Sequence, residues 1–157
     1  MEKTAVFPGS FDPFTIGHES IVRRGLQLFD KIIVAIGTNT EKAAYFPLET
    51  RLGWIRKVFE DEPRIEVMSY NSLTVDFCRR VKARFLLRGL RTAADFEYER
   101  AIAQVNHAME KDVEVVFLLT LPEHTFINSS LVREVIKYGG DASKFLPAAI
   151  SLEQQKR

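Results

Sequence analysis

A short segment near the start of the chain, "PGSFDPFTIGH" at residues 8–18, concentrates residue types that can contact an anion. Gly9 and Ser10 allow a tight turn after the first expected strand, and they offer a hydroxyl and backbone N–H groups to a ligand. Gly17 and His18 stand where a helix is expected to begin, and the unpaired N–H groups and dipole of a helix start favour a phosphate. A histidine there can donate to a phosphoryl oxygen without acting as a base. An ordinary turn with a structural histidine has a similar composition, so the segment alone leaves both interpretations open.

Other cationic and hydroxyl residues follow later apolar runs. Arg88 and Arg91 flank Gly89, and two arginines at this spacing can present forked donors to phosphates, although either alone is compatible with a solvated side chain. Ser129 and Ser130 open a helical pattern, where their hydroxyl and N–H groups can cap the helix and bind an anion together. These residues predict several donors around a phosphate-sized space.

The chain offers little for other chemistries. Gly9 and Gly17 are too far apart for the dinucleotide-binding glycine pattern, and no Gly-Lys-Ser/Thr follows, which argues against a Walker A loop. The single cysteine, Cys78, stands between Phe77 and Arg79 in a helical pattern and is predicted to pack in the core. No group of Asp, Glu and His has the spacing of a metal cage. The inventory suits phosphoryl or nucleotidyl transfer by positioning and charge stabilisation.

Apolar runs alternate with helical patterns five times along the chain. Strands are expected at residues 4–7, 32–36, 65–68, 85–87 and 113–119, and helices at residues 17–29, 52–59, 73–81, 94–109 and from 129 to the glycine pair at 139–140. Continuous apolar character suits parallel strands that are covered on both faces. The pattern predicts an α/β, Rossmann-like, doubly wound five-stranded parallel sheet with helices on both faces. In such a sheet, residues 8–18 lie at the carboxyl end of the first strand, where ligands bind.

The composition fits a single domain that covers residues 1–157, with a short helix from about residue 144 docking on it. The 157 residues are 46% apolar and 27% charged, and the formal charge of +1 gives no broad basic surface for nucleic acid. One cysteine cannot form an internal disulfide. The longest apolar run, residues 113–121, is interrupted by Glu114 and is too short for a membrane span. We therefore expect a soluble cytoplasmic protein that binds neither nucleic acid nor membrane.

Four motifs resemble those of one enzyme family. "GSFDPFTIGH", residues 9–18, is similar to the first signature of the nucleotidyltransferase superfamily, whose T/H-x-G-H element corresponds to residues 15–18. "LLRGLRTAADFEYE" (86–99), "FINSSLVREV" (126–135) and "GGDASKFLP" (139–147) resemble, in the same order, blocks of the phosphopantetheine adenylyltransferases. The resemblance therefore runs through nearly the whole chain.

The resemblance implies an enzyme that transfers AMP from ATP to 4'-phosphopantetheine, the penultimate step of coenzyme A biosynthesis. The acceptor phosphate would attack the α-phosphorus of ATP in line, without a covalent intermediate, and give dephospho-coenzyme A and pyrophosphate. Mg²⁺ would be the cofactor, held mainly by the ATP phosphates and not by a dedicated protein site. The family further implies a homohexamer and coenzyme A as a feedback inhibitor.

The same resemblance implies roles for individual residues. His18 would stabilise the transition state, with Lys42 and Arg91 sharing the developing charge. The 4'-phosphopantetheine site would contain Ser10, Lys42, Thr74 and Arg88. The ATP site would contain Ser10, Phe11, His18, Gly89, Leu90, Arg91, Glu99, His124, Thr125, Phe126, Ile127, Asn128, Ser129 and Ser130. Lys42 and Glu99 depend on the resemblance for these roles, since an exposed loop lysine or helix glutamate is otherwise unremarkable.

The chain departs from the family pattern at several positions. Asn128 stands where the family usually has serine, and Ala43 stands where a second lysine is common. Thr74 replaces a usual apolar residue, Ser10 replaces a frequent threonine, and Ile16 replaces a frequent asparagine. Because Asn128 keeps a side chain that can cap a helix, we expect it to tune the site and not to abolish it.

Two other functions remain open at this point. A sibling nucleotidyltransferase that acts on nicotinate mononucleotide or glycerol 3-phosphate would share the fold, but the "LRGLRTAADFEYE" block and the "GDASKFLP" ending disfavour it. A non-catalytic nucleotide sensor would be expected to lack His18 or the pair Arg88 and Arg91, and all three residues are present. A Rossmann-type oxidoreductase is disfavoured because the glycine fingerprint is absent.

Overall fold

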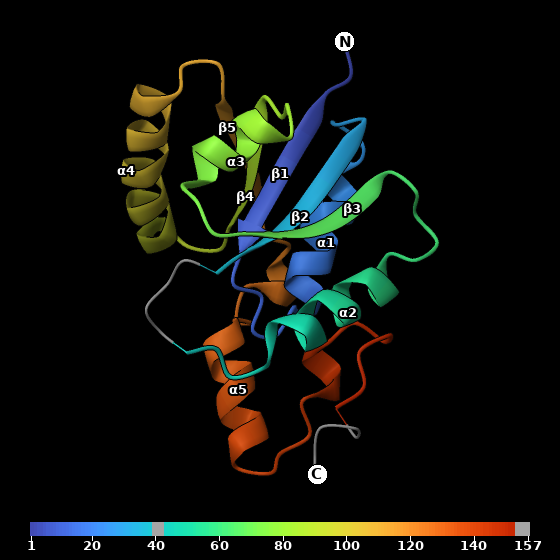
Figure 1. Ribbon diagram of the computed structural model, residues 1–157. Helices are drawn as coiled ribbons and strands as arrows, with labels where there is room; N and C mark the ends of the chain where they lie inside the picture. Colours follow the sequence, from blue (N-terminus) through green and yellow to red (C-terminus); the bar gives the residue numbers. More distant parts are fainter. Residues whose placement is uncertain (39–42, 153–157) are drawn as a thin grey trace.

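The computed structural model describes residues 1–38 and 43–152 (Figure 1). Within these residues, five parallel strands form one sheet in the order β3-β2-β1-β4-β5. The strands are β1 (Thr4–Gly9), β2 (Lys31–Gly37), β3 (Ile65–Tyr70), β4 (Phe85–Leu90) and β5 (Glu114–Leu119). The predicted five-stranded parallel sheet is confirmed, and β1, β3 and β4 run further toward their carboxyl ends than their apolar runs suggest.

Helices cover both faces of the sheet, as predicted. They are α1 (Ile16–Gly25), α2 (Leu48–Val58), α3 (Thr74–Arg80), α4 (Ala93–Met109) and α5 (Ser129–Lys137), with 3-10 turns at Pro122–His124 and Ser143–Phe145. One face packs on α1, α2 and α5 through a core that includes Phe7, Ile21, Val34, Ile55 and Val132. The other face packs on α3 through a smaller core that includes Val6, Ile33, Phe77 and Leu86. No helix in the described part of the chain is both long and apolar enough to cross a membrane.

The strand order places a topological switch next to β1. From β1 the chain passes to β2 and β3 on one side of the sheet, and it then returns to β4 and β5 on the other side (Figure 1). In open α/β sheets, ligands bind outside the carboxyl ends of the strands at such a point. Because β1 ends at Gly9 and β4 at Leu90, the segments that follow these residues border the crevice. The predicted phosphate-binding loop therefore lies at this crevice.

The first helix is shorter than predicted. α1 ends at Gly25, and the chain then turns toward β2 instead of continuing the helix to Phe29. A Cβ atom on Gly25 would lie 2.9 Å from Leu87 Cδ2 and 3.0 Å from Ile32 Cδ1. Glycine thus lets the end of α1 approach the sheet more closely than any other residue would.

The carboxyl-terminal segment also differs from the prediction. After the 3-10 turn, residues 146–152 form no helix, so the helix expected from about residue 144 is wrong for this described segment. Leu146 is extended, with φ −114° and ψ 146°, because the following Pro147 disfavours the helical region. Leu146 and Ile150 are nevertheless buried in the same core as α1 and α2. The segment therefore packs on the domain without being helical.

Gly25→Ala should lower the free energy of unfolding by about 1–2 kcal/mol, because the new Cβ must displace the buried side chains of Leu87 and Ile32. Gly53→Ala is the matched control: Gly53 is exposed in α2, and nothing lies within 4 Å of its added Cβ. This control should raise the free energy of unfolding by about 0.5–1 kcal/mol, because alanine favours the helix. Urea unfolding measures both values, and two effects of the same sign would contradict the close packing at the end of α1.

Candidate functional site

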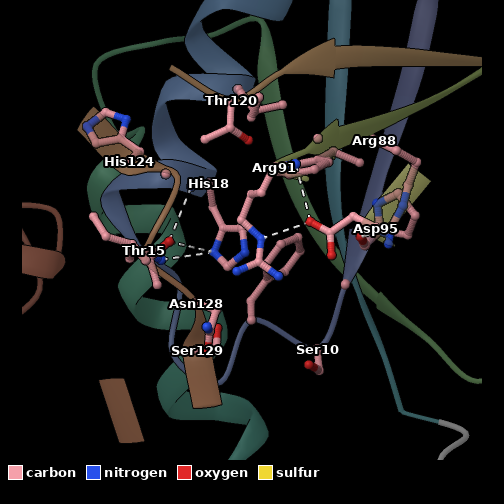
Figure 2. Close-up of a pocket in the computed structure, with 18 of the residues that line it drawn as sticks. Ser10, Thr15, His18, Arg88, Arg91, Asp95, Thr120, His124, Asn128 and Ser129 are labelled. Carbon is pink, nitrogen blue, oxygen red and sulfur yellow. Dashed lines mark hydrogen bonds and ion pairs between the residues drawn. The ribbon is translucent and has the colours of Figure 1, made fainter. Parts of the chain in front are cut away.

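A cavity of about 290 Å³ lies at the topological switch, outside the carboxyl ends of β1 and β4 (Figure 2). The loop after β1, the start of α1, the end of β4, α4, the 3-10 turn after β5 and the start of α5 all contribute to its wall. Its polar lining residues are Ser10, Thr15, His18, Arg88, Arg91, Asp95, Glu99, Thr120, His124, Asn128 and Ser129. Of the hydroxyl and cationic residues that the sequence predicts around a phosphate, Ser10, His18, Arg88, Arg91 and Ser129 line this cavity.

His18 is fixed by the residue that begins its helix. Thr15 is the N-cap of α1: its Oγ1 accepts from His18 N at 3.3 Å, and its backbone N–H donates to His18 Nδ1 at 3.0 Å. A backbone N–H can only donate, so Nδ1 must be the acceptor. In the neutral imidazole, the proton is therefore on Nε2. His18 presents a hydrogen-bond donor to the cavity that it lines.

The imidazole of His18 stays neutral at physiological pH. Burial, and then the positive charges of Arg88 and Arg91, lower the pKa of His18 from 6.5 to about 3. The aromatic rings of Phe11 and Phe14 surround it, with centroids 5.0 and 5.3 Å from the imidazole centroid. His18 is thus suited to donate a hydrogen bond to an anion and unsuited to act as a charged acid.

Two arginine–carboxylate pairs line the opposite wall. Arg88 donates Nε and Nη2 to the two carboxylate oxygens of Glu99 at 3.0 and 2.6 Å, and its Nη1 donates to Pro8 O at 2.7 Å. Arg91 binds Asp95 Oδ2 through both Nε and its backbone N–H, each at 3.2 Å (Figure 2). Asp95 and Glu99 lie one turn apart on α4, so one helix face orients both arginines and balances their charge.

A second cavity, of about 240 Å³, meets the first at the end of β1. Both cavities are lined by Pro8, Gly9, Ser10, Arg88 and Glu99. The remaining wall of the second cavity is more apolar and comprises Gly37, Tyr70, Thr74, Leu86, Ile102, Ala103, Asn106 and Val115. The hydroxyls of Tyr70 and Thr74 lie 3.0 Å apart. Two ligands could therefore occupy adjoining cavities and meet at Ser10 and Arg88.

The residues that the sequence assigned to a nucleotide fall into two groups. Those that line the first cavity are Ser10, Phe11, His18, Gly89, Arg91, Glu99, His124, Ile127, Asn128 and Ser129. Those outside its described lining are Leu90, Thr125, Phe126 and Ser130. Thr125 Oγ1 donates to Leu121 O at 3.3 Å, Phe126 is largely exposed, and Ser130 Oγ accepts from Arg133 at 3.2 Å. Of the other assigned residues, Thr74 lines the second cavity, Arg88 lines both, and Lys42 lies outside the described residues.

The start of α5 is tied to the loop after β1. Asn128 is the N-cap, and its Oδ1 accepts from Leu131 N at 2.8 Å, which confirms that asparagine keeps the capping function. Ser129 Oγ donates to Pro13 O at 2.8 Å. His124 Nδ1, in the preceding 3-10 turn, is buried and has no hydrogen-bond partner among the described residues. The helix start, with its unpaired N–H groups, therefore faces the first cavity from a fixed position.

The sequence analysis missed several lining residues. Thr120 directly follows β5, so the rule that ligands gather at the carboxyl ends of strands would have found it. Asp95 lies inside the quoted "DFEYE" block and four residues after Arg91, a spacing typical of helical ion pairs. Tyr70 is the last residue of β3, so the same rule would have found it, whereas Asn106 carried no comparable local signal because it reaches the second cavity only through the packing of α4.

The carboxylates beside the first cavity are paired with arginines, and the one cysteine is buried. No three His, Cys, Asp or Glu side chains gather there in a way that could hold a metal ion. The carboxylates of Asp95 and Glu99 are each bound to an arginine. Cys78 in α3 is buried, and burial raises the pKa of its thiol to about 12. The polar residues that line the first cavity are mainly hydroxyl, imidazole, amide and arginine side chains.

Comparison with known proteins agrees with this arrangement. Residues 6–135 match the cytidylyltransferase-like family. The fold is similar to that of a bifunctional NMN adenylyltransferase/ADP ribose pyrophosphatase from Francisella tularensis, with a TM-score of 0.70 and 16% identity, over 94% of this chain and 45% of that chain. The fold and the family match place the protein in the cytidylyltransferase-like class.

Relatives with higher sequence identity show which family within this class the chain belongs to. The chain is 49% identical to the phosphopantetheine adenylyltransferase of Flavobacterium johnsoniae over 152 residues, which cover 97% of this chain and 99% of the relative. It is 51% identical to the phosphopantetheine adenylyltransferase of Cytophaga hutchinsonii over 150 residues, which cover 96% of this chain and all of the relative. The chain belongs to the phosphopantetheine adenylyltransferase family, which confirms the resemblance of the four motifs.

The nitrogen signals of His18 should report a neutral imidazole with its proton on Nε2 between about pH 5 and about pH 8. The pKa of His18 is lower in the folded protein than in the unfolded chain. As the pH falls, His18 is therefore protonated in the unfolded chain first. The stability that neutral His18 contributes should therefore be lost as pH falls from 6.5 toward 3. Long-range ¹H–¹⁵N spectra across this range measure the tautomer, and His18→Gln assigns the signals. A titration midpoint near 6.5 would contradict the buried, neutral ring.

Proposed function

We propose that this protein transfers AMP from ATP to 4'-phosphopantetheine, forming dephospho-coenzyme A and pyrophosphate. Relatives about half identical over nearly the whole chain carry the name of this activity. The observation that carries the proposal is the pair of adjoining cavities that share Ser10 and Arg88. One cavity is polar and rich in phosphate-binding groups, and the other suits an extended, partly apolar arm.

ATP is assigned to the first cavity. The first turns of α1 and α5 border it at Gly17 and Ser129, and such helix starts stabilise phosphates. Arg91 is oriented by Asp95 and supplies a cation to the same cavity. His124, whose Nδ1 has no partner among the described residues, is assigned to the adenine end of the nucleotide. This arrangement holds the triphosphate between α1, α5 and the end of β4.

The acceptor is assigned to the second cavity. Thr74 and Tyr70 offer hydroxyls to its pantetheine arm, and Ile102 offers an apolar contact. Its phosphate would reach the shared wall, where Ser10 and Arg88 can bind it. The acceptor oxygen and the α-phosphorus of ATP would then meet at the junction of the two cavities, and such alignment supplies much of the rate enhancement.

The reaction requires no base from the protein, because the acceptor phosphate is already anionic. The phosphate oxygen attacks the α-phosphorus in line, and pyrophosphate leaves without a covalent intermediate. His18 donates its Nε2 proton as a hydrogen bond to an oxygen on the α-phosphorus, where negative charge develops. Arg91 shares that charge, and we assign the same role to Lys42.

Mg²⁺ is the cofactor that this arrangement fits. The carboxylates beside the first cavity, Asp95 and Glu99, are paired with arginines, and the described residues hold no three-ligand cluster. This donor set suits an ion held mainly by the oxygens of ATP, as is usual for Mg²⁺ in nucleotide sites. Bound there, the ion would withdraw negative charge from the phosphates.

Self-association into a homohexamer fits the exposed surface of α4. Within the described part of the chain, this helix buries none of its residues. Its large apolar side chains remain accessible, and so does the end of β5: Phe96, Tyr98, Ile102, Val105, Met109 and Leu119. Further copies of the chain would cover this surface.

We also assign the enzyme to the cytoplasm. Coenzyme A is assigned as an inhibitor that places its pantetheine arm in the second cavity.

Pyrophosphate release from Mg-ATP should occur with 4'-phosphopantetheine and not with nicotinate mononucleotide or glycerol 3-phosphate. The second cavity gives the reason, since its Thr74 and Ile102 wall is shaped for an arm that the other acceptors lack. A coupled phosphate assay measures release with each acceptor. Release with another acceptor alone would reassign the substrate, and ATP binding without release from any acceptor would indicate a nucleotide sensor.

His18→Gln should lower kcat by at least about 100-fold and change the KM for ATP only a few-fold, because the lost donor acts mainly on the transition state. His107→Gln is the matched control, since His107 is exposed near the end of α4, outside the described lining of both cavities. It should leave kcat within about twofold of the original protein. Steady-state kinetics decides the point, and a small effect of His18→Gln would remove His18 from the mechanism.

A further inference from the structure

The loop after β1 contains a strained residue that touches the His18 ring. Phe11 has a φ of 47°, in the left-handed region that large side chains rarely adopt. Its ring is buried, and its centroid lies 5.0 Å from that of the His18 imidazole. A Cβ atom on Gly9 would lie 2.8 Å from the Phe11 ring, so glycine leaves the space that the ring occupies. The backbone conformation of Phe11 thus sets one wall of the His18 site.

Arginines hold the carbonyl groups on both sides of Phe11. Arg51 Nη1 donates to Ser10 O at 2.7 Å, and Arg133 Nη1 donates to Asp12 O at 2.8 Å. These arginines come from α2 and α5, so two separate helices fix the Ser10–Phe11 peptide group before Phe11 and the Asp12–Pro13 peptide group one residue after it. In Figure 2, Ser10 lies below and to the right of His18, on the loop between β1 and α1.

Arg51 and Asp12 also join this loop to the segment before α2. Arg51 Nε donates to Phe46 O at 2.9 Å, while the Asp12 carboxylate accepts from Tyr45 N at 2.7 Å and Phe46 N at 2.9 Å. Both charged side chains are 6% exposed. Burial lowers the pKa of Arg51, and the negative charge of Asp12 opposes that effect. An apolar side chain would fill the same space without this desolvation, so packing alone does not require an arginine here.

We propose that Arg51 is a positioning residue for the reaction. It holds Ser10 O and Phe46 O with one planar guanidinium, and this fixes Phe11 and, through the Phe11 ring, the direction of the His18 donor. Arg51 is not among the described residues that line the two substrate cavities, so its effect on the reaction is indirect. The inference rests on the proposed function for its kinetic consequence, but its effect on the His18 ring does not depend on turnover.

The test compares Arg51→Met and Arg51→Lys with Arg56→Met. Lysine carries a single ammonium group and cannot reproduce the fork that reaches both carbonyls. Arg56 lies on α2 as well, but it is exposed, which makes Arg56→Met a matched control. Arg51→Met should lower kcat by about 10- to 100-fold with both KM values within about threefold, because the substrates keep their contacts while the His18 donor is misdirected. Arg51→Lys should lie between Arg51→Met and the original protein, and Arg56→Met should match the original.

A second readout separates positioning from simple loss of stability. The His18 Nε2 signal, recorded in folded Arg51→Met or Arg51→Lys, should shift or broaden, and it should remain unchanged in Arg56→Met. An unchanged kcat and His18 signal with lowered stability would overturn the proposal, as would a rise in KM alone. If Arg51→Met does not fold, Arg51→Lys carries the test with the same criteria. Failure of the original protein to release pyrophosphate would refute the proposed function, whereas the His18 signal would still decide the role of Arg51.

Discussion

One hydrogen bond, from the backbone N–H of Thr15 to Nδ1 of His18, links the fold of this protein to its chemistry. It is part of the N-cap of α1, so it forms when the chain folds from the loop after β1 into this helix. The same bond uses the only acceptor of the neutral ring and leaves Nε2 as a donor. Burial beside two arginines then keeps the ring uncharged. The start of one helix thus determines which ring nitrogen of His18 is the donor, and burial determines that the ring is uncharged.

The charges around this histidine are balanced before any substrate arrives. Arg88 and Arg91 are three residues apart at the end of β4, and α4 places Glu99 and Asp95 opposite them, one turn apart. Each guanidinium is therefore held in a fixed direction by a carboxylate. Donors that are oriented in advance need little reorganisation when a phosphate binds, and this is the physical basis of electrostatic catalysis. The carboxylates of α4 are as much part of the site as the cations that they hold.

Local patterns predicted much of this structure, whereas long-range contacts were invisible in the sequence. Continuous apolar runs indicated the parallel strands, and capping chemistry indicated that Asn128 could begin the last helix, because both effects depend on neighbouring residues. Within residues 146–152, the helix expected from about residue 144 is not formed, because Pro147 restricts the residue before it. The left-handed Phe11 and the bond between Arg51 and Ser10 O, 41 residues apart, left no local pattern, since they exist only once α2 packs against the loop.

The burial of Cys78 has a consequence for redox chemistry. This cysteine lies on α3, one turn after Thr74, which lines the second cavity, and the acceptor that we propose for that cavity ends in a free thiol. A reactive protein thiol nearby could form a mixed disulfide with such a substrate or product under oxidising conditions. Cys78 is shielded from this exchange, because its side chain is inaccessible and its raised pKa keeps the sulfur protonated. The protein can therefore bind a thiol-bearing molecule under oxidising conditions without forming a mixed disulfide with it through Cys78.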